Sequence, residues 1–312
     1  MKLSIVMPAY NEAENIMSVI SELTQTIGNC LGVSSYEIII ADDHSSDDTF
    51  SLVHQLGDKN IRCIRLSRRS GSHTAIRAGL VVATGDAVLC ISADGQDNPD
   101  VLSKMIEKIS RGAHTVWAIR NEREETLKDK LAANLFYYTL KLFASEQASK
   151  IDLANADFYL LSRKSADAIN LCNERNTSLF GLIIWIGFKQ DSVNYDRRER
   201  INGKSKWSLK SRMKLAQDWI MAFSGIPLRF ITYLGIAAAI LGFIYASYIF
   251  IAAISGYTAP GWAETALLIL LGGGVLMIML GIIGEYLWRT LEETRKRPLY
   301  FLEDDTQNIN SK

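Results

Sequence analysis

Asp86-Ala-Val-Leu-Cys-Ile-Ser-Ala-Asp-Gly-Gln-Asp97 is the stretch of sequence that decides the fold. Its apolar run over residues 87–91 is typical of a central strand that is covered on both faces. The run stops on side chains that carry oxygen ligands, and open α/β sheets bind ligands beyond the carboxyl ends of their strands. Asp94 and Gln96 are therefore candidates for a metal or phosphate site. An ordinary acidic turn is the alternative for this segment taken alone.

The N-terminal part of the chain alternates short β-rich runs with helical patterns. The expected strands cover residues 3–7, 37–41, 61–66, 87–91, 116–120 and 158–161, and the expected helices cover 14–27, 47–55, 74–83, 99–109 and 127–143. Such an alternation implies right-handed βαβ units and a mostly parallel sheet. No Gly-x-Gly-x-x-Gly motif follows the first strand, and Gly203-Lys-Ser205 lacks the first glycine of a P-loop. These two absences argue against a dinucleotide-binding domain and an NTPase.

Polar groups follow three of the expected strands. The three tips are Pro8-Ala-Tyr-Asn-Glu12, Asp42-Asp-His-Ser-Ser-Asp47 and Ser92-Ala-Asp-Gly-Gln96. Neighbouring parallel strands place such tips along one crevice. There, Asp42 or Asp43 can accept hydrogen bonds from a base or a ribose, Tyr10 can cover a ring, and Asp94 can hold a divalent cation that bridges a diphosphate. Taken singly, each group is better explained as a turn or a helix cap, but together they predict a nucleotide site.

Charge is distributed unevenly along the chain. The formal net charge of the 312 residues is +0, so the overall charge indicates no attraction to nucleic acid. Between Arg197 and Lys214, however, eight Lys or Arg residues stand against the single acid Glu199. Such a patch faces a polyanion or an anionic membrane surface. The four cysteines show no metal-site spacing, which indicates reduced thiols in a cytosolic domain.

Two long apolar stretches lie in the C-terminal third. Residues 230–263 carry no charge, and none follows Glu264 until Glu285. Each stretch reaches the roughly 20 residues that cross a bilayer. The expected organisation is a cytoplasmic domain over 1–206, an amphipathic juxtamembrane helix over 207–225, a two-helix transmembrane hairpin over 226–288 and a cytoplasmic tail over 289–312. A soluble helical hairpin and a plain domain helix are the respective alternatives for the apolar stretches and for the amphipathic segment.

The flanking charges predict an orientation for this hairpin. Arg229 precedes the first stretch and Arg289 follows the second, whereas the loop between the stretches carries no positive charge. Both termini should therefore be cytoplasmic, in a multi-pass protein of the inner membrane. Glycines at 272–274, 281 and 284 form a small-residue face that suits close helix packing, so we expect a homo-oligomer, with a tetramer favoured.

The three strand tips and the paired C-terminal stretches resemble the polyprenyl-phosphate glycosyltransferases of glycosyltransferase family 2. This group includes bactoprenol glucosyltransferases, aminoarabinose transferases and dolichol-phosphate mannose synthases. The resemblance covers nearly the whole chain. It implies a Rossmann-like GT-A fold, a nucleotide-diphosphate sugar donor, Mg²⁺ or Mn²⁺, inversion at the sugar carbon and a lipid phosphate acceptor.

The resemblance also implies roles for individual residues. It places the donor nucleotide at Pro8, Tyr10, Asn11, Glu12, Asp42 and Asp43, the metal at Asp94 and Gln96, the reaction centre at Asp94 and Asp157, and a mobile loop that closes on the diphosphate at Arg200, Lys204, Ser205 and Lys206. Asp157 can remove a proton, orient the sugar or the acceptor, or simply cap the start of its strand.

Two positions depart from the family pattern. Ser92 stands where the family commonly has Asp, a loss for which Asp97 can compensate, and His44 stands where it has Gly.

The chemistry of the acceptor predicts many cations and few bases in the site. A phosphate monoester has a second pKa of about 6, so it is a nucleophilic oxyanion at neutral pH without a general base. The cations placed to receive this phosphate are Arg120, Arg123, Lys128 and Lys130, while Lys204 and Lys206 can neutralise the leaving group. A solvated charged helix is the alternative for residues 120–130, where acids interleave with the bases.

The function expected from these features is transfer of a hexose, most readily glucose from UDP-glucose, to undecaprenyl or a similar polyprenyl phosphate. Mannose or aminoarabinose is an alternative sugar. A processive polysaccharide synthase is less well supported, because the chain lacks a Gln-x-x-Arg-Trp motif. A weakly active partner that presents nucleotide sugar or lipid phosphate to a membrane complex is the alternative from another class, and Ser92 keeps it open.

Overall fold

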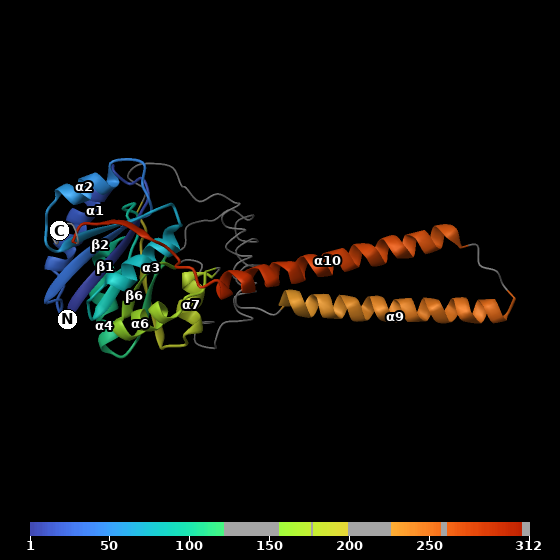
Figure 1. Cartoon of the computed structure of the whole chain (residues 1–312). Coiled ribbons are helices and arrows are strands. Elements are labelled where there is room, and N and C mark those ends of the chain that lie inside the picture. The colour runs from blue at the N-terminus through green and yellow to red at the C-terminus, as the bar shows by residue number, and fades with distance from the viewer. Residues whose placement is uncertain (122–155, 176, 199–225, 257–260, 308–312) are drawn as a thin grey trace. The chain divides into compact units, whose positions relative to one another are not determined.

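A computed structural model describes residues 1–121, 156–175, 177–198, 226–256 and 261–307. The chain divides into two compact units (Figure 1). The larger unit contains residues 1–213 and 298–312, and the smaller unit contains residues 214–297. The helix expected over 127–143 and the amphipathic helix expected over 207–225 lie outside the described residues.

One eight-stranded sheet organises the larger unit, in the order β7-β5-β6-β4-β1-β2-β3-β8. Its strands are β1 (Lys2–Ala9), β2 (Ser35–Asp42), β3 (Ile61–Leu66), β4 (Ala87–Cys90), β5 (Thr115–Arg120), β6 (Ala156–Ser162), β7 (Gln190–Tyr195) and β8 (Leu302–Asp305). The pairs β1–β2, β1–β4, β2–β3 and β5–β7 are parallel. Strand β6 runs antiparallel to β4 and β5, and β8 runs antiparallel to β3. The predicted α/β fold with a mostly parallel sheet is confirmed.

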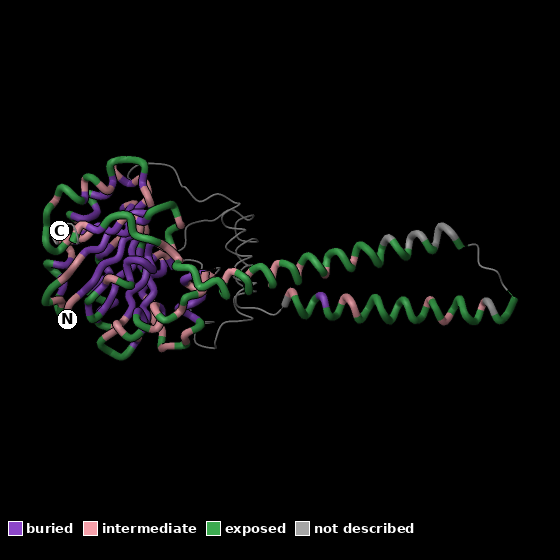
Figure 2. Tube along the Cα trace, in the orientation of Figure 1, coloured by how far each residue is buried: buried purple, intermediate pink, exposed green. Residues whose placement is uncertain are grey.

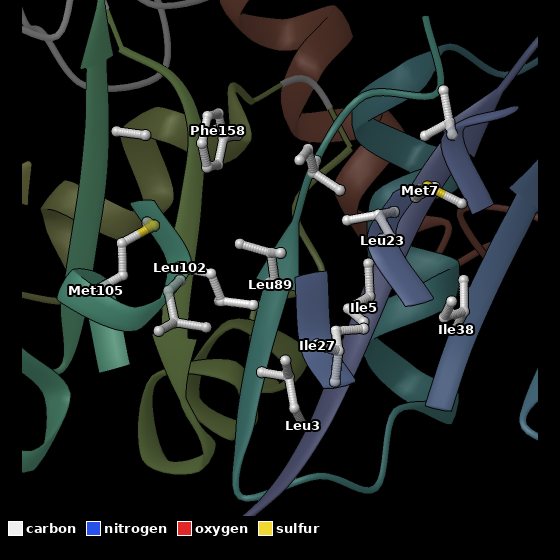
Figure 3. Close-up of a cluster of buried hydrophobic side chains, with 14 of the residues drawn as sticks. Leu3, Ile5, Met7, Leu23, Ile27, Ile38, Leu89, Leu102, Met105 and Phe158 are labelled. Carbon is white, nitrogen blue, oxygen red and sulfur yellow. The ribbon is translucent and has the colours of Figure 1, made fainter. Parts of the chain in front are cut away.

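Helices cover both faces of this sheet. They are α1 (Ile16–Gly28), α2 (Thr49–Gln55), α3 (Ser72–Val82), the short 3₁₀ turn η1 (Pro99–Val101), α4 (Leu102–Ser110), α6 (Arg163–Leu171) and α7 (Leu179–Trp185). Successive side chains of a strand point to opposite faces. Leu3, Ile5 and Met7 of β1 accordingly share one core with Leu23 of α1 and Met105 of α4 (Figure 3).

The opposite face of β1 packs closely against α3. A Cβ atom on Gly79 would stand 2.4 Å from Cγ1 of Val6, so the helix lies where only a glycine fits. This contact holds α3 against the centre of the sheet, where β1 is flanked by β2 and β4. The residues just before α3 are thereby placed near the carboxyl end of β2.

The smaller unit contains two long apolar helices, α9 (Ile226–Ile254) and α10 (Trp262–Thr294). Their segments Pro227–Ala252 and Leu271–Thr294 have mean hydropathies of 2.2 and 1.6, which makes them long and apolar enough to cross a membrane. Their described side chains are largely exposed, unlike the purple core of the sheet (Figure 2). A soluble helical hairpin would bury such a surface. Glu285, the first acid within Leu271–Thr294, pairs with Nε of Arg289 at 3.0 Å.

Four described elements were absent from the expectation: α6, α7, β7 and β8. The last of these lies in the segment expected to be a tail. Its pairing with β3 returns the chain from the smaller unit to the sheet of the larger unit.

Candidate functional site

The predicted strand tips meet at one edge of the sheet, because β4, β1 and β2 are adjacent and parallel. Ala9 stands opposite Asp42 in the register of β1 and β2. Pro8, Tyr10 and the carboxylates after β2 are consequently close together, as the sequence predicted. The tip of β4 follows on the other side of β1.

Hydrogen bonds from backbone amides to side-chain oxygens tie the tip of β1 to the tip of β2. The amide of Asn11 donates to Oγ of Ser45 at 3.0 Å, and Oδ1 of Asn11 accepts from the amide of Ser46 at 2.8 Å. The amide of Glu12 donates to Oγ1 of Thr49 at 2.9 Å. Asn11 is held with φ at 54°, in the left-handed region that asparagine tolerates better than most residues. Asn11 and Glu12 therefore hold the two tips together through their backbone amides, and Asn11 does so through its side chain as well.

Asp42 and Asp43 play different roles. Asp43 accepts hydrogen bonds from the amides of Ser70 at 2.6 Å and Gly71 at 2.8 Å, so it anchors the loop that leads into α3. Asp42 accepts from the amide of Ser45 through Oδ1, while its buried Oδ2 has no hydrogen-bond partner among the described residues. Burial raises the pKa of both carboxyls above the ordinary value for Asp. Asp42 is the better candidate for a ligand contact, although Nη1 of Arg65 lies 3.5 Å from Oδ2.

His44 explains one departure from the family pattern. Its φ is 60°, a backbone conformation that glycine adopts without strain. The Nδ1 atom of His44 lies 3.1 Å from the carbonyl oxygen of Leu66 and 3.2 Å from Oε2 of Glu303. These contacts hold a side chain where the family commonly has none.

The tip of β4 is organised around Asp94. Its Oδ1 accepts hydrogen bonds from Oγ of Ser92 at 2.7 Å and from the amide of Gln96 at 3.1 Å, while Gly95 makes the turn with φ at 73°. Ser92 thus orients the one carboxylate at this tip instead of adding a second. Asp97 turns into the protein, where it accepts from the amide of Ser92 at 3.1 Å. Burial raises the pKa of Asp97 to about 6.

The donor set suits a divalent cation that arrives together with its ligand. No three His, Cys, Asp or Glu residues gather as a metal cage within the part of the chain that the structure describes. Asp94 and Gln96 nevertheless offer hard oxygen atoms. Mg²⁺ typically takes one or two carboxylates from a protein and completes its shell with substrate phosphates and water. The residues present fit such a cation better than a permanently bound structural metal.

Asp157, the second residue of β6, lies in the same centre. It accepts a hydrogen bond from the Tyr195 hydroxyl at 2.6 Å, and its Oδ1 lies 3.3 Å from Nη1 of Arg197 and 3.8 Å from Nη1 of Arg120. The Tyr195 hydroxyl also lies 3.2 Å from Oδ1 of Asp97. Asp157 is therefore linked to the tip of β4 and surrounded by cations, which goes beyond the capping of a strand.

Sequence reasoning missed the part that Tyr195 and Arg197 play. Arg197 was counted only as part of the basic patch, and Tyr195 was not singled out. Tyr195 ends β7 opposite Arg120 of β5, a pairing that brings residues 75 positions apart to one strand end. The alternation of buried Val193 and Tyr195 before a run of arginines was the signal available.

Several predicted site residues lie outside the described residues. They are Arg123, Lys128 and Lys130 of the expected acceptor site, and Arg200, Lys204, Ser205 and Lys206 of the expected loop. Arg120, at the end of β5, is described and lies beside Asp157.

A mostly parallel sheet with helices on both faces, ending in an acidic site at its carboxyl edge, is the architecture of the GT-A class. Two solved structures share this fold at low sequence identity. A mycobacterial protein matches with a TM-score of 0.53 at 18% identity, over 71% of this chain and 74% of the other. Glucosyl-3-phosphoglycerate synthase from Mycobacterium tuberculosis, solved with Mn²⁺, UDP and glucosyl-3-phosphoglycerate, matches with a TM-score of 0.50 at 18% identity, over 70% of this chain and 77% of that chain.

Residues 4–167 match the model of glycosyl transferase family 2. An uncharacterized glycosyltransferase from Synechocystis sp. is 37% identical and covers 97% of this chain and 95% of its own length. A bactoprenol glucosyl transferase from Shigella phage SfV is 34% identical, over 98% of this chain and 100% of the relative. A prophage bactoprenol glucosyl transferase homolog from Escherichia coli is 36% identical, over 97% and 99%. The chain belongs to glycosyl transferase family 2 and is a glycosyltransferase, as the strand tips indicated.

Proposed function

We propose that the protein transfers a hexose, most readily glucose from UDP-glucose, to a polyprenyl phosphate of the undecaprenyl type. The products are the polyprenyl-phosphate sugar, with inverted configuration at the sugar carbon, and UDP. The observation that carries this proposal is the joining of Asp94, Gln96 and Asp157 with Arg120 and Arg197 at one end of the sheet. Relatives named bactoprenol glucosyl transferase, which align over nearly the whole chain, support the choice of acceptor.

The donor nucleotide is assigned to the tips of β1 and β2. Tyr10 and Asp42 offer a ring face and a carboxylate oxygen to the nucleoside, and Pro8, Asn11, Glu12 and Asp43 shape the pocket around it. In the structure the guanidinium of Arg69 stacks on the Tyr10 ring, 4.0 Å from the ring centroid. That contact supports the assignment, because the face of the Tyr10 ring already packs against a planar group.

The diphosphate of the donor is assigned to the tip of β4. Asp94 and Gln96 would hold Mg²⁺ or Mn²⁺ there, in keeping with the Mn²⁺ and UDP of the mycobacterial synthase. When bound, the cation stabilises the charge that develops on the leaving diphosphate. Ser92 keeps the Asp94 carboxylate oriented for this task, and the loop with Arg200, Lys204, Ser205 and Lys206 closes over the leaving group.

The acceptor is assigned to the cationic side of the centre. Arg120, with Arg123, Lys128 and Lys130 beyond it, receives the lipid phosphate, whose oxyanion attacks the sugar carbon. Asp157 is flanked by two guanidiniums and accepts from a phenol, so its role in this scheme is to orient cations. The nucleophile needs no proton removed at neutral pH.

The membrane location is part of the proposal. The smaller unit begins and ends at the larger unit, because β8 pairs with β3 after the chain leaves α10. If α9 and α10 both cross the bilayer, the chain returns to the side on which it started. The basic residues outside the hairpin then place both termini in the cytoplasm, in a multi-pass inner-membrane protein that assembles as a homo-oligomer, with a tetramer favoured.

The test is transfer of labelled sugar to lipid. Full-length protein in detergent is incubated with labelled UDP-glucose, polyprenyl phosphate and Mg²⁺, and the product is identified by mass spectrometry. We expect labelled lipid, and a fall of at least about 100-fold in the Asp94→Asn variant, because the metal loses its charged ligand. Asp100→Asn, at an exposed acid on the following turn, serves as the matched control.

Each outcome of this test is informative. Labelled lipid from GDP-mannose or another nucleotide sugar, and none from UDP-glucose, would change the sugar and keep the reaction. Nucleotide binding by calorimetry, without turnover on any donor, would favour the binding-partner alternative instead. Normal Mg²⁺-dependent transfer in Asp94→Asn would refute the metal assignment.

A further inference from the structure

The end of β7 ties the donor side of the reaction centre to the acceptor side. Tyr195 and Arg197 both reach Asp157, and each also reaches the tip of β4. Strand β7 is the outermost strand on this side of the sheet. Neither residue has a role in the scheme above other than to surround Asp157.

Tyr195 is built to fix a position. Its ring is buried and packs edge-on against Phe158, with 5.0 Å between ring centroids. Its hydroxyl lies between Oδ2 of Asp157 and Oδ1 of Asp97, at 2.6 and 3.2 Å. The ring of Tyr195 is fixed by packing, and its hydroxyl is fixed by two carboxylates. The Asp157 side chain, which accepts from this hydroxyl, therefore has little conformational freedom.

Arg197 differs from Tyr195 because one of its donors has no partner in the part of the chain that the structure describes. The side chain is 31% exposed, so solvent and ligands reach it. Nη2 donates to Oε1 of Gln96 at 2.9 Å, and Nη1 lies 3.3 Å from Oδ1 of Asp157. Nε is buried and has no hydrogen-bond partner among the described residues. A guanidinium has five N–H donors, and a buried donor without an acceptor is costly.

The charges around Arg197 favour an anion. Arg120 and Arg197 approach the same Oδ1 atom of Asp157, so two guanidiniums share one carboxylate. Arg120, Arg197 and Asp157 alone sum to one positive charge, and the carboxylates of Asp94 and Asp97 lie beyond them at the tip of β4. A planar guanidinium that presents several donors matches the oxygens of a phosphate better than an ammonium does.

We propose that Arg197 is a phosphate-binding residue of the reaction centre, and that Tyr195 is a positioning residue that holds Asp157, and through it Arg197, in place. The proposal rests on the proposed function for the source of the phosphate. Two sources share this chemistry: the monophosphate of the lipid acceptor and the diphosphate of the donor. Gln96 borders the donor side and Arg120 the acceptor side, and Arg197 contacts groups on both.

Binding measurements test the proposal without turnover. Full-length Arg197→Gln is titrated calorimetrically with farnesyl monophosphate and, separately, with UDP in the presence of Mn²⁺. We expect at least one of the two affinities to fall about tenfold or more, the scale of one hydrogen bond to a charged group. The matched control is Arg111→Gln, which removes the same charge from a side chain that is 74% exposed and pairs only within its helix turn with Glu107 among the described residues.

The two titrations identify which substrate supplies the phosphate that Arg197 binds. Weaker binding of farnesyl monophosphate alone assigns Arg197 to the acceptor, and weaker binding of UDP with Mn²⁺ alone assigns it to the donor. Affinities for both probes within twofold of the unsubstituted protein would overturn the proposal. Since neither arm needs transfer, failure of the proposed reaction and failure of this inference are distinguishable.

Two further variants separate phosphate binding from a structural role. Arg197→Lys keeps the charge but loses the fork of donors, so its affinity for the same probe should lie between those of Arg197→Gln and the unsubstituted protein. Tyr195→Phe keeps the ring packing and removes the hydroxyl, and it should weaken the same probe that Arg197→Gln weakens. Unaltered binding of that probe in a folded Tyr195→Phe protein would overturn the positioning role of Tyr195.

Discussion

Single residues at the strand tips show how a departure from a family pattern can be accommodated. Ser92 donates to the carboxylate of Asp94, and Asp97 uses its two oxygens for Ser92 and Tyr195. The expectation that Asp97 replaces a missing metal ligand therefore does not match its hydrogen bonds. Orientation of one carboxylate takes the place of a second carboxylate at this tip.

His73 packs against α7. It stands at the start of α3, where a histidine can bind phosphate, yet its Nδ1 accepts from the amide of Leu179 at 3.4 Å and its ring stacks on Phe180. Burial lowers the pKa of His73 to about 4. The ring is consequently neutral and packed in the folded protein.

This pKa predicts a pH dependence of stability. The unfolded chain binds a proton at His73 near pH 6.5 and the folded protein only near pH 4, so stability falls as the pH drops between these values. The loss between pH 7 and pH 5 is about 2 kcal/mol. Thermal unfolding measures this loss as a drop in the unfolding temperature between pH 7 and pH 5. In full-length His73→Gln this drop should be correspondingly smaller. His54→Gln, at an exposed site, should retain the shift, and identical shifts in the two variants would contradict the assignment.

Among the elements, β8 links the C-terminal segment to the β3 edge of the sheet. Asp305 accepts from Nε of Arg62 at 3.0 Å and from Nη2 at 2.6 Å, and Glu303 accepts from Nε of Arg65 at 3.1 Å. Arg65 in turn lies 3.5 Å from Asp42. The strand also covers the edge of β3, whose backbone groups would otherwise be unpaired.

Removal of the Asp305 carboxylate should therefore destabilise the larger unit. In Asp305→Ala the partly buried guanidinium of Arg62 loses its bidentate carboxylate partner. We expect the free energy of unfolding to fall by about 2 kcal/mol, because the charge of Arg62 remains without its partner. Denaturant unfolding of the full-length protein in detergent measures this loss. Asp304→Ala, next to it and exposed, should change stability by less than about 0.5 kcal/mol. Equal effects of the two substitutions would show that the pairing of Arg62 and Asp305 contributes little.

For the whole molecule, the return of the chain to one sheet constrains the topology. Residues 61–66 and 302–305 pair in the same sheet, although the two long apolar helices lie between them in the sequence. An arrangement with the sheet on both sides of a membrane is impossible. Only an even number of crossings is compatible with this pairing.

This constraint predicts the accessibility of engineered cysteines. In intact cells, a membrane-impermeant maleimide should label Gly261→Cys, just before α10, and should label Asp304→Cys only after lysis. The native Cys30, Cys63 and Cys90 are buried, and the partly exposed Cys172 is replaced by serine to lower the background. Labelling of Asp304→Cys in intact cells would contradict the cytoplasmic assignment of the larger unit, and protection of Gly261→Cys would argue against two crossings.

The sequence by itself determined the parallel strands β1 to β4, the acidic tips that follow them, the two long apolar helices and the family. These features are local. We can recognise an apolar run, a polar strand tip or a stretch of about 20 apolar residues from the sequence without knowing which elements pack against it. It also placed Asp94, Gln96 and Arg120 at strand ends. It did not separate the anchoring role of Asp43 from the buried, partly unpaired carboxylate of Asp42.

Only the tertiary structure decided what those tips face. Strand β6 enters antiparallel between β4 and β5, and β7 pairs beyond β5, which together bring Asp157, Tyr195 and Arg197 to the tip of β4. Strand β8, with the acidic sequence Leu302-Glu-Asp-Asp305, becomes a strand because β3 offers it an open edge and two arginines. Strand order and edge pairing join residues that are distant in sequence, and no local pattern encodes which edges remain free.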